Sequence, residues 1–546
     1  MSTTTPGSAP WPASIRAGFS TDPEIGSGNF FHRLRALSVV TDEPLIWAQD
    51  AQVDPRAPSG LSVGRFGAIV DRVAAFHHAR GVRRRDVVPL YAADGLAPFV
   101  HFLALSGLGA IPALLNGRLE PSVAASFIRR VAAHSVVTDA ERSSSLRQAL
   151  GRPLELCTLS ETLAERALPL PLQYPFRHAD EDPVLLTHSS GTTGEPKAVL
   201  LQHQQFFAAV RFRLRLPIPQ GAERVLSALP TVHNSSITLL SLALLNGTPL
   251  MTLSKRDSSS VLRTIGEFRP SLVAAFPETH VELCEEDLSQ HDLSSVAIWY
   301  NSGDAAHEVH VRKLVAYGNH VAGRPRKLQP GSHFVDGLGS SEMGHSLFHV
   351  TRGPSSANYA RCVGKPMPFV DAAVLDEEGV ALPVNAIGRL GVRSPTVTQG
   401  YWNDSELTWR SRLNGYWLTG DLVYRDDDGY FYHLDRVTDA IQTEQGVLYS
   451  CQAEELLLSR LPNLADCSIV GVPSGGGPAH PVALLRLAPG VDVNSANLLR
   501  EVNEVLTAAR MPNVSRAIAS DHSDLPIGVT GKVKKRTIRE QLAALA

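Results

Sequence analysis

The chain has 546 residues, of which 43% are hydrophobic and 19% charged, and its formal net charge is −3. This balance is typical of a globular protein with a well-filled core, and the length is sufficient for one large multilobed domain and a small one. A charge so close to neutrality argues against nucleic acid or an anionic membrane surface as the main partner.

The five cysteines are scattered along the sequence, which argues against a disulfide framework or a zinc ribbon and favours a reducing compartment. Residues 1–18 are rich in Ser, Thr and Pro and lack the apolar segment of a signal peptide. No stretch is long and apolar enough to span a bilayer. We therefore expect a cytoplasmic protein with no membrane partner, whose residues 1–25 form a flexible tail.

Apolar strands alternate with helices in the first part of the chain. The expected strands are 44–47, 87–91, 111–115, 135–138, 225–229, 272–275 and 297–301, and the expected helices are 67–80, 98–108, 122–133 and 237–245. This alternation predicts an α/β fold with parallel and mixed sheets flanked by helices.

Beyond about residue 364 short strands and turns dominate, and Asp427-Asp428-Gly429 is typical of a hairpin turn. After Arg436 a compact α+β pattern follows. Its expected elements are a helix near Glu454, strands at 468–472 and 483–487, and a helix at 496–509. We place a domain boundary near residues 435–439. The expected organisation is a tail (1–25), a large N-terminal domain (26–435) and a small C-terminal domain (436–546).

The strongest functional signal is the segment Thr187-His-Ser-Ser-Gly-Thr-Thr-Gly-Glu-Pro-Lys197, directly after an apolar strand. Small residues let the backbone curl so that successive N–H groups point at one anion, while hydroxyls add donors and Lys197 adds charge. The segment predicts a phosphate-binding loop made of Thr187, Ser189, Ser190, Gly191, Thr192, Thr193, Gly194 and Lys197. It is not a P-loop, because no G-x-x-x-x-G-K-[ST] pattern occurs, and a flexible linker seldom carries Pro-Lys directly after a buried strand.

With this loop, the chain from about Pro44 to Arg539 resembles the superfamily of acyl-CoA synthetases, peptide-synthetase adenylation domains and luciferases. The resemblance implies that the loop wraps the β- and γ-phosphates of ATP. It also implies two half-reactions: an acid and MgATP form an adenylate and pyrophosphate, and a small mobile C-terminal domain then rotates to admit a nucleophile.

Two further segments match the superfamily in the right order. Asn301-Ser-Gly-Asp-Ala-Ala306 resembles the adenine-side loop and assigns Gly303, Asp304 and Ala305 to the nucleotide. Gly337-Leu-Gly-Ser-Ser-Glu342 resembles the Tyr-Gly-x-Thr-Glu segment, so that Gly339, Ser340 and Ser341 contact the nucleotide and Glu342 holds Mg²⁺. The usual adenine-stacking aromatic is Leu338 here, and Gly337 and Leu338 would border the substrate. The segment looks most like the benzoate-CoA ligase branch.

The C-terminal third carries three more matches. In Tyr416-Trp-Leu-Thr-Gly-Asp421 the resemblance implies that Asp421 accepts hydrogen bonds from both ribose hydroxyls, for which a carboxylate has the capacity. Arg436 matches an arginine near the ribose and phosphate. Pro526-Ile-Gly-Val-Thr-Gly-Lys532 resembles the terminal loop whose lysine bridges the two anions that must meet, so Lys532 is the expected catalytic lysine. A basic run such as Lys532 to Arg536 is otherwise typical of a solvated face.

The acid substrate should lie near Pro230-Thr-Val-His-Asn-Ser-Ser236. His233 matches a position that lines the pocket and gates the acceptor tunnel, and is an expected catalytic and substrate residue. Asn234 is similar to the partner of that histidine in hydroxybenzoate-adenylating enzymes. Both favour a small aromatic carboxylate as the substrate, although pocket residues vary freely and His233 could serve packing alone.

The second half-reaction fits the superfamily less well. Thr438 stands where Asp or Lys is usual at the hinge, Gln442 where a lysine follows, and Cys451 where a proline is usual. The resemblance implies that these positions serve thioester formation, so CoA as acceptor is in doubt while adenylation is not affected.

Three activities stay open: an aryl or acyl-CoA ligase, an enzyme that loads a carrier protein, and a natural-product-pathway member that adenylates nitrite for diazotisation of an aromatic amine or forms an amide. The altered hinge favours the third. A catalytically inactive homologue is a further alternative, but Lys532 and Glu342 are both present. A dinucleotide enzyme is disfavoured because no G-x-G-x-x-G follows the early strands.

Overall fold

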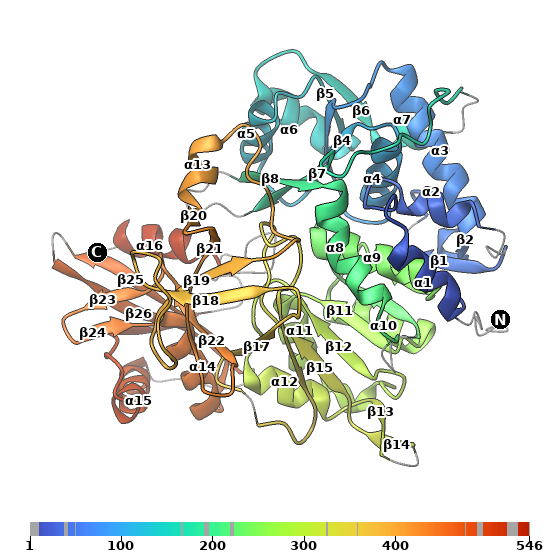
Figure 1. The fold of residues 1–546 in the computed structure, drawn as a ribbon. Helices are drawn as coiled ribbons and strands as arrows, with labels where there is room; N and C mark the ends of the chain where they lie inside the picture. Colours follow the sequence, from blue (N-terminus) through green and yellow to red (C-terminus); the bar gives the residue numbers. More distant parts are fainter. Residues whose placement is uncertain are drawn as a thin grey trace.

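The computed structural model describes residues 10–37, 42–49, 51–164, 168–189, 196–218, 223–323, 326–357, 359–474, 477–488, 495–520 and 533–544. The chain builds two large sheets and a smaller C-terminal sheet, and β1 and β2 at the start of the chain join the second large sheet (Figure 1). The expected α/β class is confirmed.

The first sheet has six strands in the order β6-β5-β3-β4-β7-β8. They are β3 (Val87–Ala92), β4 (Ile111–Asn116), β5 (Ser135–Thr138), β6 (Glu155–Thr158), β7 (Pro183–Ser189) and β8 (Lys197–Gln202). All neighbours are parallel except β7 and β8, which form an antiparallel pair. The phosphate-loop segment is thus the connection of a hairpin at one edge of this sheet.

Helices cover both faces of this sheet, and its strands are therefore apolar on both sides. The helices are α3 (Val63–Ala79), α4 (Ala97–Gly107), α5 (Pro121–Arg130), α6 (Ala140–Leu150) and α7 (Leu159–Leu163). Leu90 and Leu114 pack with α3 and α4 in one core cluster, while Tyr91 and Leu115 pack with α5 and α6 in another.

The second sheet has a parallel half and an antiparallel half. The parallel half contains β1 (Pro44–Ala48), β10 (Leu250–Thr252), β9 (Val225–Ser227), β11 (Leu272–Ala275), β12 (Ile298–Asn301) and β15 (His333–Asp336), with β2 (Leu61–Ser62) antiparallel at its edge. Beyond β15 the order continues antiparallel through β16 (Phe348–Arg352), β17 (Cys362–Pro366), β22 (Phe431–Arg436), β21 (Tyr416–Arg425), β19 (Gly388–Arg393) and β18 (Asp371–Leu375). Most of this antiparallel half comes from the region beyond about residue 364, for which the sequence predicted short strands and turns.

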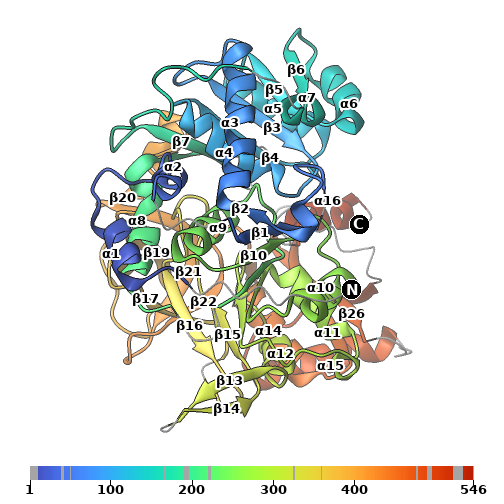
Figure 2. The same cartoon turned by 90° about the vertical axis from the view of Figure 1, so that its right-hand side faces the viewer.

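The remaining elements of the large unit are helices and short pairs. They are η1 (Ala57–Ser59), α8 (His203–Leu214), α9 (Asn234–Asn246), α10 (Ser258–Phe268), α11 (Pro277–Glu285), η2 (Leu288–Gln290), α12 (Glu308–Val315), β13 (Asn319–Ala322), β14 (Lys327–Pro330), α13 (Ser405–Arg410) and β20 (Arg412–Leu413). Figure 2 shows α8 and α9 between the two sheets.

The C-terminal part has its own core. It contains β23 (Ile441–Thr443), β24 (Gly446–Leu448), α14 (Ser450–Arg460), β25 (Leu464–Ser474), β26 (Gly477–Leu487), α15 (Ser495–Ala508), β27 (Arg516–Ser520) and α16 (Lys535–Ala544). Strands β25, β26 and β27 form a separate three-stranded sheet. The boundary proposed near residues 435–439 covers the last two residues of β22 and the connection that follows it toward β23.

The expectation of a flexible tail over residues 1–25 is wrong for the part from residue 10 onward. Residues Ala13–Thr21 form α1, which contacts α8 and α9, and α2 (Phe30–Arg35) follows. The indole Nε1 of Trp11 donates to the carbonyl of Leu244 at 2.8 Å. Trp11 and Phe19 bury apolar surface in the core that includes these helices. The free energy gained by this burial outweighs the low propensity of the Ser/Pro-rich segment for regular structure. Residues 1–9 lie outside the described residues.

Candidate active site

The cavity

A cavity of about 470 Å³ lies at the ends of β7, β12 and β15, beside the N-terminal end of α9. This volume is within the usual range for a small-molecule site. The structure brings to its wall the following predicted residues: Ser189, Lys197, His233, Asn234, Gly303, Gly337, Gly339, Ser340, Ser341, Glu342 and Arg436. Segments separated by more than two hundred residues therefore meet in one site.

Several predicted residues lie behind this wall. Thr187 is buried within β7, and Leu338 is buried in the core beside Leu347 and Phe348. Asp304 and Ala305 also do not line the cavity, although their neighbour Gly303 does. Leu338, which stands at the position of the usual aromatic, is thus a core residue, and the structure does not bring it to the cavity wall.

The loop ends and the acidic residue

The described ends of the phosphate loop face each other across the hairpin, because Ser189 pairs with Lys197 in register. Residues 190–194 lie outside the described residues. The Ser189 hydroxyl is buried and has no hydrogen-bond partner among the described residues. The Lys197 ammonium is 5.3 Å from the centroid of the Tyr401 ring, which fixes its direction toward the cavity.

Glu342 is held by the same tyrosine. The Tyr401 hydroxyl donates to Glu342 Oε1 at 3.0 Å, and the Thr398 N–H donates to the Glu342 carbonyl at 2.8 Å. Burial raises the pKa of Tyr401, and the Glu342 charge raises it further, so the phenol remains a donor. One carboxylate oxygen is oriented in this way while Oε2 is available for a cation bound to phosphate oxygens, as Mg²⁺ requires.

Asp336 ties together the loops that follow β12 and β15, and it is not among the residues predicted from the sequence. Its Oδ1 accepts from Asn301 Nδ2 at 2.9 Å and from the Gly337 N–H at 2.8 Å, and its Oδ2 accepts from the Ala306 N–H at 3.2 Å. Arg352 neutralises this buried carboxylate at 3.2 Å. A signal was present in the sequence, since a carboxylate directly after an apolar strand and before glycine is typical of a loop-fixing residue.

The ribose-side carboxylate and the pocket histidine

Asp421 is almost fully buried on β21, beside the cavity-lining Thr419 and Gly420. Its Oδ1 lies 2.9 Å from Arg436 Nε and 3.3 Å from His433 Nε2. Burial alone would raise the pKa of Asp421, but the Arg436 guanidinium and His433 hold it well below its ordinary value. The carboxylate is therefore ionised and poised to accept hydrogen bonds.

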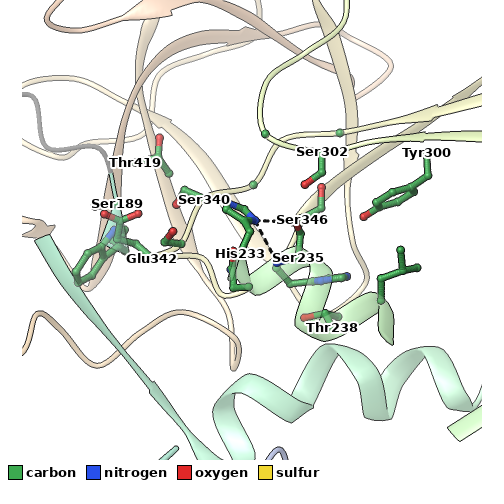
Figure 3. A pocket seen from close by; sticks show the side chains of 18 of the residues that line it. Ser189, His233, Ser235, Thr238, Tyr300, Ser302, Ser340, Glu342, Ser346 and Thr419 are labelled. Atoms are coloured by element: carbon green, nitrogen blue, oxygen red, sulfur yellow. Dashed lines mark hydrogen bonds between the residues drawn. The ribbon is translucent and has the colours of Figure 1, made fainter. Parts of the chain in front are cut away.

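His233 is the N-cap of α9. Its Nδ1 accepts from the Ser235 N–H at 3.3 Å and lies 2.7 Å from the Ser235 hydroxyl, and its ring packs edge-on against Phe276. Because Nδ1 accepts, the neutral ring carries its proton on Nε2. In Figure 3 His233 lies between the end of the cavity with Ser189 and Glu342 and the end with Tyr300. Asn234 is buried, and its Oδ1 has no partner among the described residues.

The C-terminal lysines

Lys532, the expected catalytic lysine, lies outside the described residues. Another lysine of the basic run, Lys535, does not belong to a solvated face. Its ammonium is 2.6 Å from both Ser450 Oγ and Glu454 Oε1 and is buried between α14 and α16. Lys535 therefore joins the last helix to the rest of the C-terminal part.

Replacing Lys535 with Met should lower the free energy of unfolding by about 3–5 kcal/mol, because the substitution leaves Glu454 as a buried, unpaired charge. Chemical denaturation measures this change. Lys534 is exposed one position earlier, so Lys534→Met is the matched control and should be close to neutral. Equal stability of the two variants would contradict the structural role of Lys535.

Relatives

The family model for AMP-binding enzymes matches residues 49–402. The chain belongs to the AMP-binding enzyme family. The expectation of an adenylate-forming, ligase-type enzyme is therefore confirmed, together with its resemblance to acyl-CoA synthetases. No helix in the described part of this family member is long and apolar enough to cross a membrane.

Among its relatives is a 3-aminoavenalumate diazotase of a Streptomyces species, 44% identical over 97% of this chain and 98% of the relative. A 3-amino-2-hydroxy-4-methoxybenzoate diazotase of Streptomyces cremeus is 27% identical, over 93% and 94% of the two chains. An anthranilate CoA ligase in complex with anthranoyl-AMP has a similar fold. Its TM-score is 0.82, with 21% identity over 96% of this chain and all of that one.

Proposed function

We propose that this AMP-binding enzyme is an ATP-dependent diazotase, which adenylates nitrite and transfers its nitroso group to an aromatic amine. The observation that carries the proposal is the 44% identity to a relative named as a diazotase, over nearly the whole of both chains. The departures at Thr438, Gln442 and Cys451 support it, because they affect positions that the resemblance ties to thioester formation. The sequence also left open the transfer of an aromatic carboxylate to CoA, the loading of a carrier protein and the formation of an amide.

The chemistry balances without an external oxidant or reductant. An oxygen of nitrite attacks the α-phosphorus of ATP, the bond to the pyrophosphate oxygen breaks, and a mixed anhydride of nitrite and AMP forms. The amine nitrogen then attacks the nitroso nitrogen, the N–O bond to AMP breaks with its electron pair on AMP, and the amine loses a proton. The resulting nitrosamine tautomerises to a diazohydroxide, whose hydroxyl takes up one proton, equivalent to the one the amine released, and leaves as water, which gives the diazonium ion.

In the first step two anions must approach each other, and the chain would offset their repulsion with cations and N–H donors. We assign Lys532 and Lys197 to the phosphate groups, with the hydroxyls of Ser189, Ser190, Thr192 and Thr193. Glu342 would hold Mg²⁺, which supplies charge neutralisation of the departing pyrophosphate. Asp421 would accept from the ribose hydroxyls with Arg436 beside it, and Gly303 and Gly339 would border the nucleotide.

For the second step we assign His233 as a donor. Its Nδ1 already accepts from Ser235, so the proton on Nε2 can stabilise the oxygen charge that develops on AMP as the N–O bond breaks. This role places the amine close to His233, with its ring toward the Tyr300 end of the cavity.

Nitrite should be required for pyrophosphate release, which is measured by ATP–pyrophosphate exchange and by total pyrophosphate with an aromatic amine present. The diazonium product is trapped by azo coupling to a phenol and read from its absorbance. Benzoate, cinnamate, fatty acids and amino acids, each with and without CoA, serve as controls. Release with an aromatic carboxylate in the absence of nitrite, together with a CoA thioester, would refute the proposal and identify a CoA ligase.

A further inference from the structure

Arg213 brings a positive charge to the wall of the cavity and has no acidic partner among the residues that the structure describes. It lies in the last turn of α8 and lines the cavity. Its Nε donates to Nε2 of His345 at 3.0 Å, and no Asp or Glu of the described chain forms an ion pair with it. A guanidinium has five N–H donors, so four remain for a ligand.

The neighbour of Arg213 cannot supply the missing charge. Burial lowers the pKa of His345 well below its ordinary value, and the Arg213 guanidinium lowers it further, so this imidazole is neutral. Its Nε2 accepts from Arg213, and the pair fixes the plane of the guanidinium. An arginine oriented in this way, half-buried and with no counter-ion in the described part of the chain, matches a carboxylate bound through two parallel hydrogen bonds.

Arg213 lines the cavity together with Tyr300, which lies at the end opposite to the phosphate loop (Figure 3). Burial raises the pKa of the Tyr300 phenol, while the charge of Arg213 lowers it. Figure 3 shows Tyr300 at one end, Ser189 and Glu342 at the other, and His233 between them. A molecule that reaches from His233 to Arg213 must therefore extend through the part of the cavity next to α9.

The walls of this part suit a flat, mostly apolar body. They include Val225, Leu239, Leu242 and Leu272. Two buried acceptors on α9, Asn234 Oδ1 and Thr238 Oγ1, have no partner among the described residues although both side chains line the cavity. Leaving such buried polar atoms without a hydrogen bond costs free energy, and a polar substituent on the ring of the ligand would supply the missing partner.

We propose that Arg213 binds the carboxylate of an aromatic amino acid whose amino group is turned toward His233, and that it selects such amines over uncharged ones. The inference rests on the proposed diazotase function, because it places the amine rather than the adenylated acid in this part of the cavity. The carboxylate that docks on Arg213 takes no part in the reaction. Its role is to hold the amine nitrogen near the activated nitroso group.

The test compares 3-aminocinnamate and 3-aminobenzoate with their carboxamides, which keep the shape and lose the charge. In Arg213→Gln, kcat/KM for the carboxylates should fall about 100-fold, mainly through KM, as expected for the loss of a two-point charged contact. The carboxamides should change less than threefold, so the preference for the acid disappears. Arg213→Lys keeps the charge and should recover part of the preference. Arg215→Gln, an exposed arginine two residues further along the chain, is the matched control.

Two further measurements separate this inference from the proposed function. Nitrite-dependent ATP–pyrophosphate exchange without amine should be unchanged in Arg213→Gln; if the native chain shows no such exchange, the diazotase proposal itself fails. Calorimetric binding of 3-aminocinnamate without ATP should be lost in Arg213→Gln and retained in Arg215→Gln. Equal losses for acids and carboxamides, or an unchanged preference for acids, would overturn the assignment of Arg213.

Discussion

Replacing Lys532 with Ala should reduce pyrophosphate release by about 10²–10³-fold, the effect of removing one preorganised charge-stabilising donor. The lysine is expected to bridge nitrite and the α-phosphate, two anions that otherwise repel. Once the adenylate has formed this contact is no longer needed, so the second half-reaction should be affected much less. Single-turnover measurements of pyrophosphate release and of diazonium formation separate the two steps.

The neighbouring lysines provide the controls for this prediction. Lys534 is exposed, so Lys534→Ala should retain full activity, while Lys535→Ala should lose stability first, because its ammonium is buried against Glu454. Thermal unfolding of Lys532→Ala should match that of the native chain. Full pyrophosphate release by a correctly folded Lys532→Ala would show that another cation performs this role.

Replacing Asp421 with Ala should weaken ATP binding by roughly 2–4 kcal/mol, because buried, charge-assisted hydrogen bonds to the ribose would be lost. The substitution also leaves Arg436 without its partner at 2.9 Å. Asp421→Asn keeps the side-chain volume and serves as a second variant if the alanine form does not fold. Isothermal titration with ATP measures the loss.

The hairpin that carries Asp421 offers a matched control. Asp427 lies in its exposed turn, and Asp427→Asn should leave ATP affinity unchanged. The folded-state pKa of Asp421 is depressed, so its stabilising contribution is present above its ordinary value of 3.8 and is lost as the pH falls below it. In Asp421→Asn the free energy of unfolding should therefore depend less on pH in the acidic range. An unchanged ATP affinity in both Asp421 variants would refute the ribose role.

The regular elements were predictable where one local pattern dominates. The strands at 87–91, 111–115 and 272–275 are apolar on both faces, and the structure places them in the interior of parallel sheets. The start of α9 was less clear, because His233 caps the helix by accepting from Ser235 although histidine is an unusual N-cap residue. The helix consequently begins three residues before the expected start at Ile237.

The N-terminal segment is a part of the fold that amino-acid composition alone does not predict. A Ser/Pro-rich start has the signature of a loose tail, but Trp11 and α1 contact α8 and α9. Gly247 follows α9 in the left-handed region with a φ of 68°, and a Cβ there would lie 2.5 Å from the Trp11 ring. Only the close approach of two distant segments creates this contact, so no local propensity could indicate it.

The sequence by itself determined the chemistry class of this protein. The loop from Thr187 to Lys197, with Glu342, Asp421 and Lys532, resembles the motifs of adenylate-forming enzymes. The small residues of the loop are those required wherever a backbone must grip phosphate. The tertiary structure decided what else surrounds the adenylation site. It buried Leu338 in the core, it set Lys535 in a largely buried ion pair with Glu454, and it brought Arg213 and Tyr300 to the wall of one cavity. From sequence alone, an arginine on a helix is expected to lie on the protein surface. Arg213 becomes an anion site in our proposal only because the fold packs it against a neutral histidine in the wall of the cavity.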